Sequence, residues 1–265
     1  MEELVYLKLG GSLITDKNNP LTPRPDVLER LSAEIAAARR ENPELRLVLG
    51  HGSGSFGHSV ARRYGTVHGV RTPEQWQGFA EVWQAARALN QIVVEALTRA
   101  GLPVIAFPPS ATIVSENGLP VQWNREPLAA ALRANLIPLV NGDVVFDTIL
   151  GGTILSTEDV FRLYAGHFPP SRVLLAGIEA GVWADYPQRT RLVEHIRLDT
   201  FSQVAAAIGG SQAVDVTGGM AAKVQEMLSL IEAAPGTQVM IFSGLDPGAV
   251  QAALRGERTG TVLSA

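Results

Sequence analysis

Two hydrophobic spacings alternate along the chain. Short runs of adjacent apolar residues, typical of buried strands, cover 4–9, 46–50, 103–107, 137–140, 172–176 and 238–242. Between these runs, apolar residues recur every three or four positions, which predicts helices over 25–42, 73–100, 126–135, 156–165 and 199–208, one that ends near 233, and one over 246–255. Strands that alternate with helices form a mostly parallel sheet covered on both faces, so the pattern predicts an α/β fold.

Two stretches depart from this alternation and predict hairpins. Asn117-Gly118 separates two extended runs, a strong signal for a two-residue turn, and a second hairpin is predicted over 144–153. Residues 184–197 are polar and are expected to be irregular. Pro169-Pro170 is the best candidate for a boundary between two lobes, 1–170 and 171–265, of a single domain.

Composition and charge exclude several classes of protein. The 265 residues include 22 Lys and Arg against 26 Asp and Glu, a net charge of −4, which argues against nucleic acid as a partner. The chain has no cysteine, which excludes thiolate metal sites and cysteine nucleophiles. No apolar run approaches the roughly 18 residues of a membrane span, and the acidic N-terminus does not resemble a signal peptide. We therefore expect a cytoplasmic protein with no membrane partner.

The glycine-rich stretch 50–58 follows the second predicted strand. Gly52, Gly54 and Gly57 leave the backbone bare, so an anion could approach the amides closely. They match G-x-G-x-x-G, but a dinucleotide site would follow a first strand and need an acidic residue about 20 positions on. A P-loop would need lysine where His58 stands. On this stretch alone, a phosphate loop touched by His58 and an ordinary strand-to-helix turn are equally consistent.

Three further groups of chemically active residues stand at predicted strand or helix ends. They are Lys8 to Ser12 (KLGGS), Asn141-Gly142-Asp143, and Thr217-Gly218-Gly219 with Lys223 one turn inside a helix. Each group alone is compatible with an exposed turn. Together, two lysines, a histidine and two glycine loops exceed what one phosphate needs. They fit two phosphate-bearing ligands that face each other, which is the arrangement of phosphoryl transfer.

These motifs, in this order and across nearly the full length, resemble the amino acid kinase family. KLGGSLITDK (8–17), HGSGSFGH (51–58) and DVTGGMAAK (215–223) are similar to its isopentenyl phosphate kinase branch. His58 is shared with the fosfomycin kinases and separates both from acetylglutamate, aspartate, uridylate and carbamate kinases. The resemblance implies a three-layer αβα sandwich with the acceptor bound in the N-terminal lobe and ATP in the C-terminal lobe. It also implies ATP-dependent phosphorylation of isopentenyl phosphate to isopentenyl diphosphate.

The resemblance also implies roles for individual residues. Lys8, Lys17 and Lys223 would neutralise the transferring phosphates, His58 would bind the acceptor phosphate, and Asp143 would orient the lysines. ATP contacts are expected at Lys8, Gly10, Gly11, Ser12, Ser53, Gly177, Gly218, Gly219 and Lys223. Acceptor contacts are expected at Gly52, Gly57, His58 and Gly142. Magnesium is expected to be held mainly by the nucleotide, with no protein ligand predicted, and the family indicates a homodimer.

Three features leave alternatives open. The apolar stripe of Phe79, Val82, Trp83 and Ala86 is either ordinary core or the wall of an isoprenoid pocket. Ser53 stands where this branch usually has glycine, and Ile178 and Ala180 replace two aspartates near the nucleotide, which puts the adenine and ribose contacts in question. The competing functions are fosfomycin kinase, another small phosphate or phosphonate kinase, and a nucleotide-binding sensor without activity. A Rossmann oxidoreductase ranks well below all of these.

Overall fold

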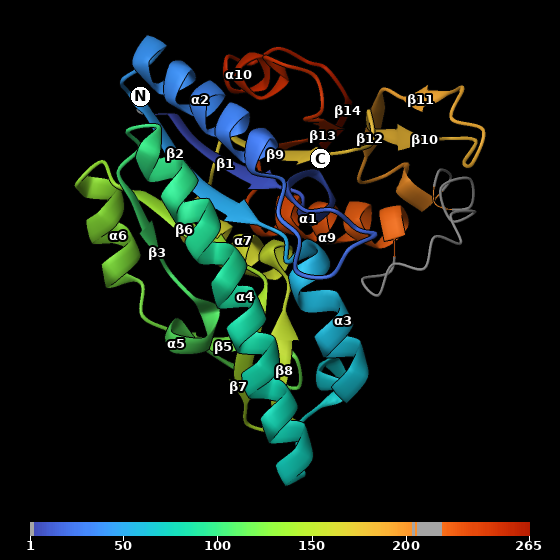
Figure 1. Cartoon of the computed structure of the whole chain (residues 1–265). Helices are drawn as coiled ribbons and strands as arrows, with labels where there is room; N and C mark the ends of the chain where they lie inside the picture. Colours follow the sequence, from blue (N-terminus) through green and yellow to red (C-terminus); the bar gives the residue numbers. More distant parts are fainter. Residues whose placement is uncertain (1–2, 203–204, 206–218) are drawn as a thin grey trace.

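The computed structural model describes residues 3–202, 205 and 219–265. Its centre is an eight-stranded sheet with helices on both faces, which confirms the predicted α/β sandwich (Figure 1). Neighbouring strands are parallel except β13 and β14. The order across the sheet is β12 (His195–Arg197), β14 (Thr261–Ser264), β13 (Gln238–Ser243), β9 (Arg172–Gly177), β1 (Glu3–Leu9), β2 (Leu45–His51), β6 (Ile137–Asn141) and β3 (Val104–Ala106).

Two apolar cores lie on opposite faces of this sheet. One joins the sheet to α2 (Pro25–Glu41), α4 (Pro73–Arg99) and α10 (Ala249–Leu254). The other joins it to α6 (Glu126–Arg133), α7 (Thr157–Ala165) and α9 (Gly219–Ala233). Strand β1 serves both, because neighbouring side chains of a strand point to opposite faces: Leu7 enters the first core and Tyr6 the second. Burial on both faces explains the continuous apolar runs of the sequence.

The helix ends follow local sequence signals. Thr72 begins α4 with a capping box, in which its side chain accepts from the backbone of Gln75 and the Gln75 side chain accepts in return. Ser156 caps α7 in the same way with Asp159, as predicted. The Ser156 cap fixes the first turn of α7, which carries Glu158 and Asp159 and lies beside the end of β2.

A separate four-stranded sheet contains both predicted hairpins. Its order is β5 (Leu119–Trp123), β4 (Ile113–Glu116), β7 (Asp143–Asp147) and β8 (Gly151–Leu155). The turn residues Asn117 and Gly118 have φ angles of 50° and 80°, the left-handed conformation that favours this pair. Helix α4 packs against β7, so this sheet lies beside the long helix (Figure 1).

The C-terminal third differs most from the prediction. Residues 184–197 were expected to be irregular, but β12 forms there, and Leu192–Val193 (β11) pairs with Val182–Trp183 (β10). Strand β14 was not predicted, and the last helix covers only Ala249–Leu254. Half of the helix predicted over 199–208, and the motif residues 215–218, lie outside the described residues. Within the described part of the chain, no helix is long and apolar enough to span a membrane.

Candidate active site

The site is organised around Lys8, near the carboxyl end of β1. Its ammonium group forms an ion pair with Glu158 in the first turn of α7, and the two side chains are only 13% and 6% exposed. The Thr157 hydroxyl donates to the backbone oxygen of His51 over 2.7 Å, which fastens the start of α7 to the end of β2. Burial acts to raise the pKa of Glu158, but the charges of Lys8 and Lys223 outweigh it and lower that pKa. Glu158 is therefore ionised at neutral pH.

The two glycine loops form one continuous backbone surface. The first loop leads from β1 into α1 (Gly11–Ile14), and the second leads from β2 into α3 (Gly54–Tyr64). A Cβ on Gly52 would lie 2.7 Å from the Gly11 nitrogen, and one on Gly11 would clash with the Gly54 nitrogen. The Ser55 N–H donates to the Thr15 hydroxyl over 3.0 Å. Both loops need glycine because their backbones touch, and a Cβ in either loop would collide with the other. This need is independent of whether a ligand binds there.

Helix α9 adds a third side to the site. Lys223 and Glu226 are one turn apart on α9, which packs against α7. Partial burial and the nearby carboxylates of Glu158 and Asp159 raise the pKa of Glu226 to about 7, although Lys8 and Lys223 oppose this shift. Glu158 and Glu226 are carboxylates that sequence reasoning missed. The signal for Glu158 was present, as an acidic residue in a capped first turn, but it was interpreted only as helix capping.

Comparison with known proteins shows that residues 3–243 match the amino acid kinase family. The chain belongs to the amino acid kinase family. It is 31% identical to the isopentenyl phosphate kinase of Methanocaldococcus jannaschii over 97% of both chains, and 32% identical to that of Methanothermobacter thermautotrophicus over 96% of both. A solved structure of isopentenyl phosphate kinase matches with a TM-score of 0.82 and 29% identity, covering 99% of this chain and 100% of the other.

The hydrogen-bond partners of Asp143 are a serine hydroxyl and backbone N–H groups. Its carboxylate accepts from the Ser110 hydroxyl at 2.7 Å and from the Val144 N–H at 2.8 Å, and burial raises its pKa. The carboxylate beside Lys8 is that of Glu158. The assignment of Asp143 as the residue that orients the lysines therefore stays a prediction, with Glu158 as the carboxylate seen beside Lys8. The motif could not distinguish the two, because both carboxylates follow short polar turns.

The remaining family motif residues fall into three groups. Gly10, Gly11, Ser12, Gly52 and Ser53 lie in the joined loops, and Gly57 packs against Ser53 inside α3. Gly177 ends β9, Gly142 separates β6 from β7, and Gly219 begins α9. Lys17 is exposed beyond α1, and Gly218 lies outside the described residues. The backbone of His58 lies in α3, but its side chain is not among those described.

The predicted acceptor wall is only partly buried. Phe79, Val82 and Ala86 are at most 7% exposed, and the first two join Val144 in a small third apolar cluster. The Trp83 side chain is 37% exposed. The Arg87 guanidinium carbon lies over the Trp83 ring, 5.6 Å from the ring centre. The four side chains share one side of α4, as their spacing requires, but Trp83 lies at the exposed border of that side. Periodicity alone could not show where the buried face of α4 ends.

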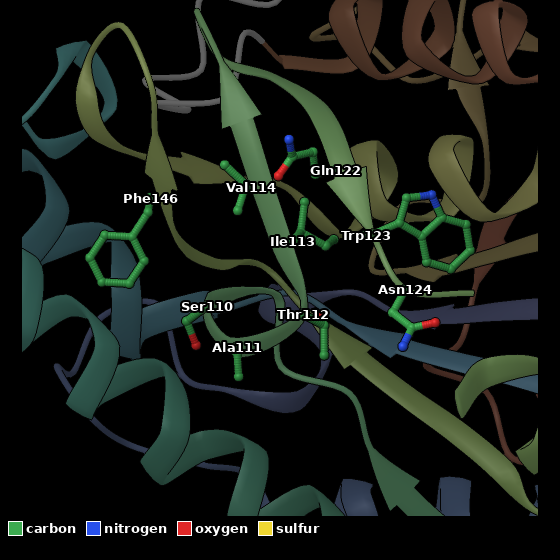
Figure 2. Close-up of a pocket in the computed structure, with 9 residues that line it drawn as sticks. All are labelled: Ser110, Ala111, Thr112, Ile113, Val114, Gln122, Trp123, Asn124 and Phe146. Atoms are coloured by element: carbon green, nitrogen blue, oxygen red, sulfur yellow. The ribbon is translucent and has the colours of Figure 1, made fainter. Parts of the chain in front are cut away.

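An open groove of about 520 Å³ lies elsewhere, on the four-stranded sheet (Figure 2). Its lining comes from α5 (Pro109–Thr112), β4, β5 and Phe146 of β7. None of the predicted site residues whose side chains or backbone the structure describes lines it. The concave space and the charged chemistry are thus separate in this structure.

Proposed function

We propose that this protein is an isopentenyl phosphate kinase, which transfers the γ-phosphoryl group of ATP to isopentenyl phosphate. The observation that carries the proposal is the buried ion pair of Lys8 and Glu158 beside two glycine loops in backbone contact. This arrangement holds one cation in a fixed place where the bare backbones of both loops meet. The full-length similarity to isopentenyl phosphate kinases supports the choice of acceptor.

The chemistry needs charge neutralisation and alignment more than a general base. The second pKa of a phosphate monoester is about 6, so the acceptor oxygen is already largely ionised at neutral pH. Lys8 stabilises charge on the transferring group, and Lys223 on α9 neutralises the ATP phosphates. Glu158 holds Lys8 in position, which is the role first predicted for Asp143. Lys17 and His58 keep their predicted roles, with Lys17 near the ATP phosphates and His58 on the acceptor phosphate.

Magnesium fits this arrangement because the protein's own cations are partly compensated. Glu158 balances Lys8, and Glu226 adds a further acidic group next to Lys223. Two lysines thus cannot neutralise a triphosphate alone. A Mg²⁺ ion held mainly by the nucleotide would supply the missing positive charge.

The acceptor tail is assigned to the third apolar cluster, which Phe79 and Val82 form with Val144 and Val70. Ala86 continues the same buried face of α4. An apolar tail gains about 0.8 kcal/mol for each CH₂ that it buries. Fosfomycin would gain little there, because it needs polar groups around its acceptor.

We further infer a cytoplasmic homodimer. Strand β3 is one of the two edge strands of the eight-stranded sheet, and its Ile105 side chain is 42% exposed. A second copy could cover this edge by strand pairing. Light scattering of the wild type and of Ile105→Lys tests this inference, with a dimer expected for the first and a monomer for the second.

A kinase assay that compares isopentenyl phosphate and fosfomycin side by side tests the proposed function. We expect ATP-dependent formation of isopentenyl diphosphate at a kcat/KM well above that for fosfomycin. The reverse preference would favour the fosfomycin kinases. ATP binding without turnover of either acceptor would identify a nucleotide-binding sensor.

A further inference from the structure

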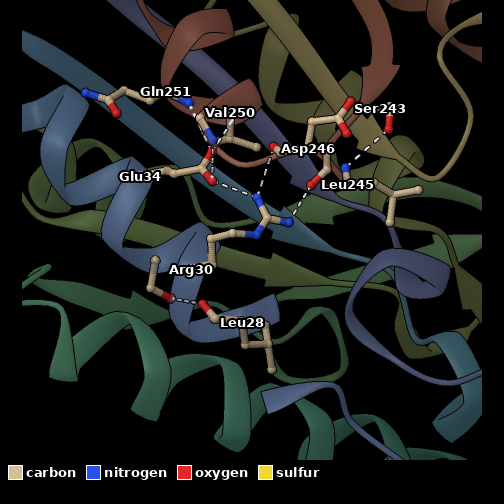
Figure 3. Close-up of polar contacts among 11 residues, drawn as sticks. Leu28, Arg30, Glu34, Ser243, Leu245, Asp246, Val250 and Gln251 are labelled. Atoms are coloured by element: carbon tan, nitrogen blue, oxygen red, sulfur yellow. Dashed lines mark hydrogen bonds and ion pairs between the residues drawn. The ribbon is translucent and has the colours of Figure 1, made fainter. Parts of the chain in front are cut away.

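Helix α2, in the N-terminal half, holds a loop of the C-terminal half through two charged side chains (Figure 3). Glu34 is only 7% exposed, and its carboxylate accepts from the N–H groups of Gly248 at 3.0 Å and Val250 at 2.9 Å. These amides belong to the start of α10, where backbone N–H groups have no partner within the helix. The Glu34 carboxylate therefore acts as the cap of a helix far away in sequence.

Arg30 completes this contact from one turn earlier on α2. Its guanidinium pairs with Glu34 at 2.6 Å and donates to the backbone oxygens of Gly244 at 2.7 Å and Asp246 at 3.2 Å. We call Arg30 and Glu34 the α2 clamp. The clamp binds the loop 244–248 at its beginning, middle and end.

The clamped loop borders the row of strand ends that carries the predicted ATP contacts. Ser243, the last residue of β13, is in register with Gly177 of β9. The Gly244 N–H donates to the Gly177 oxygen over 2.8 Å, and the Gly10 N–H donates to the Ala176 oxygen over 2.8 Å. A Cβ on Gly244 would lie 2.7 Å from the Leu13 side chain, so the loop also packs on α1. Movement of this loop would disturb the nucleotide half of the site directly.

Two exposed apolar side chains follow these strand ends. Leu245 is 45% exposed after β13, and Ile178 is 37% exposed after β9. The Leu245 N–H donates to the Ser243 hydroxyl over 3.2 Å, which fixes the turn that presents Leu245. Exposed aliphatic side chains at the carboxyl edge of a parallel sheet suit the flat face of a nucleobase. Ile178 and Ala180 stand where the family usually has two aspartates, so few polar groups remain there to bind the base of a nucleotide.

We propose that Arg30 and Glu34 are positioning residues for the nucleotide, because the α2 clamp sets the loop that carries Leu245, which follows one of the two paired strand ends and forms, with Ile178 after the other, one wall of the base subsite. The inference rests on the proposed function, since it takes ATP as the ligand. Charge-assisted hydrogen bonds are short and directional, so they define the loop position more narrowly than apolar packing would. A buried ion pair adds little net stability compared with apolar residues of similar size, which fits a positioning role.

The chain supplies a matched control for this proposal. Glu41, two turns further along α2, pairs with Arg255 and accepts from Gln251 at 2.8 Å. These contacts join the same two helices, but they are exposed and lie away from the loop 244–248. Glu41→Gln therefore weakens the α2–α10 contact without touching the proposed base wall.

Calorimetric titration of ATP into the full-length protein, without acceptor, tests the clamp. Glu34→Gln and Arg30→Met should each raise the dissociation constant of ATP about tenfold, as expected for one lost charge-assisted hydrogen bond, whereas Glu41→Gln should change it less than about twofold. In kinase assays, the clamp variants should raise KM for ATP and leave KM for isopentenyl phosphate unchanged. Arg30→Lys, which keeps the charge but loses the fork that reaches two carbonyls, should fall between wild type and Arg30→Met.

The outcomes separate the two proposals. Unchanged ATP affinity in folded clamp variants, with a lowered melting temperature alone, would show that the clamp is only structural. Equal losses in Glu34→Gln and Glu41→Gln would show the same. If the wild type binds ATP but does not phosphorylate isopentenyl phosphate, the proposed function fails while the clamp is still tested by ATP binding. If the clamp variants do not fold, Arg30→Lys decides: wild-type affinity in that variant contradicts the proposal.

Discussion

Two buried carboxylates, Glu158 beside the eight-stranded sheet and Asp147 in the four-stranded sheet, have different kinds of partner. Asp147 is 4% exposed and accepts from the backbone N–H groups of both hairpin turns, at 2.8 Å from Gly118 and 2.7 Å from Leu150. The Ser115 hydroxyl adds a contact at 2.8 Å. Glu158 instead faces the ammonium group of a long, flexible side chain, Lys8.

The kind of partner decides what each carboxylate can do. Burial acts to raise the pKa of Asp147, but the hydrogen bonds from Leu150, Gly118 and Ser115 outweigh it and hold that pKa well below its ordinary value. The Asp147 oxygens are already bonded to fixed donors of the protein, so they stabilise two turns and are not available to a ligand. Glu158 instead holds a side-chain ammonium group in place next to the glycine loop that follows β1, so we expect the second pair to take part in phosphate binding. Burial of a carboxylate alone does not separate the two roles.

The largest expected effect is at the lysines. Lys8→Ala and Lys223→Ala should each lower kcat by about 10²–10³-fold, by analogy with a lost oxyanion donor, because a fixed cation matters most where charge develops in the transition state. Steady-state kinetics should show that kcat changes more than either KM. Wild-type kcat in either variant would show that this lysine has no part in the phosphoryl-transfer step.

Asp147→Asn should have the opposite profile. We expect the free energy of unfolding to fall by about 2–4 kcal/mol, because several buried N–H groups lose a charged acceptor, while kcat per folded molecule stays the same. Urea denaturation and kinetics measure the two quantities. Because its folded pKa is lowered, Asp147 stabilises the fold above its ordinary pKa of 3.8, and this contribution is lost as the pH falls below that value. Asp185→Asn, in an exposed turn with similar bonds, is the control and should lose less stability.

For the carboxylates near Lys8, Glu226→Gln should give a smaller effect that depends on pH. Its pKa rises from 4.5 to about 7 on folding, so the folded protein binds more protons than the unfolded chain between these values. Stability therefore falls as the pH rises through this window. Glu226→Gln should raise the melting temperature at pH 8 and leave it nearly unchanged at pH 4. The exposed Glu232→Gln on the same helix should shift neither value, and an equal gain there would point to general surface charge instead.

The smallest effect is expected at the apolar wall. Phe79→Ala should raise kcat/KM for geranyl phosphate relative to isopentenyl phosphate, because a shorter wall admits a longer tail. Trp83→Ala should change this ratio less, since the ring is already 37% exposed. A competition assay with both substrates measures the ratio. If Phe79→Ala lowers the melting temperature and leaves the ratio unchanged, the cluster is ordinary core.

Much of the fold follows from local patterns. Helix α4, the two hairpins and the Ser156 cap were predicted because periodicity, Asn-Gly and capping residues act over a few neighbouring positions. Strands β12 and β14 were missed because they have three and four residues, and their order comes from pairing at the sheet edge. Sequence patterns therefore predict elements with strong local signals better than short strands that form only by pairing with the sheet.

For the site, the sequence by itself determined the chemical inventory: two glycine loops, the lysines and their order along the chain. Only the tertiary structure decided how these parts meet. It brought the backbones of Gly11 and Gly54 into contact and paired Lys8 with Glu158. It also placed the Glu34 carboxylate against a loop more than 200 positions away in the sequence. The physical reason is that a charge or a bare backbone can be recognised locally, whereas its partner depends on distances that the packing of helices on a sheet sets.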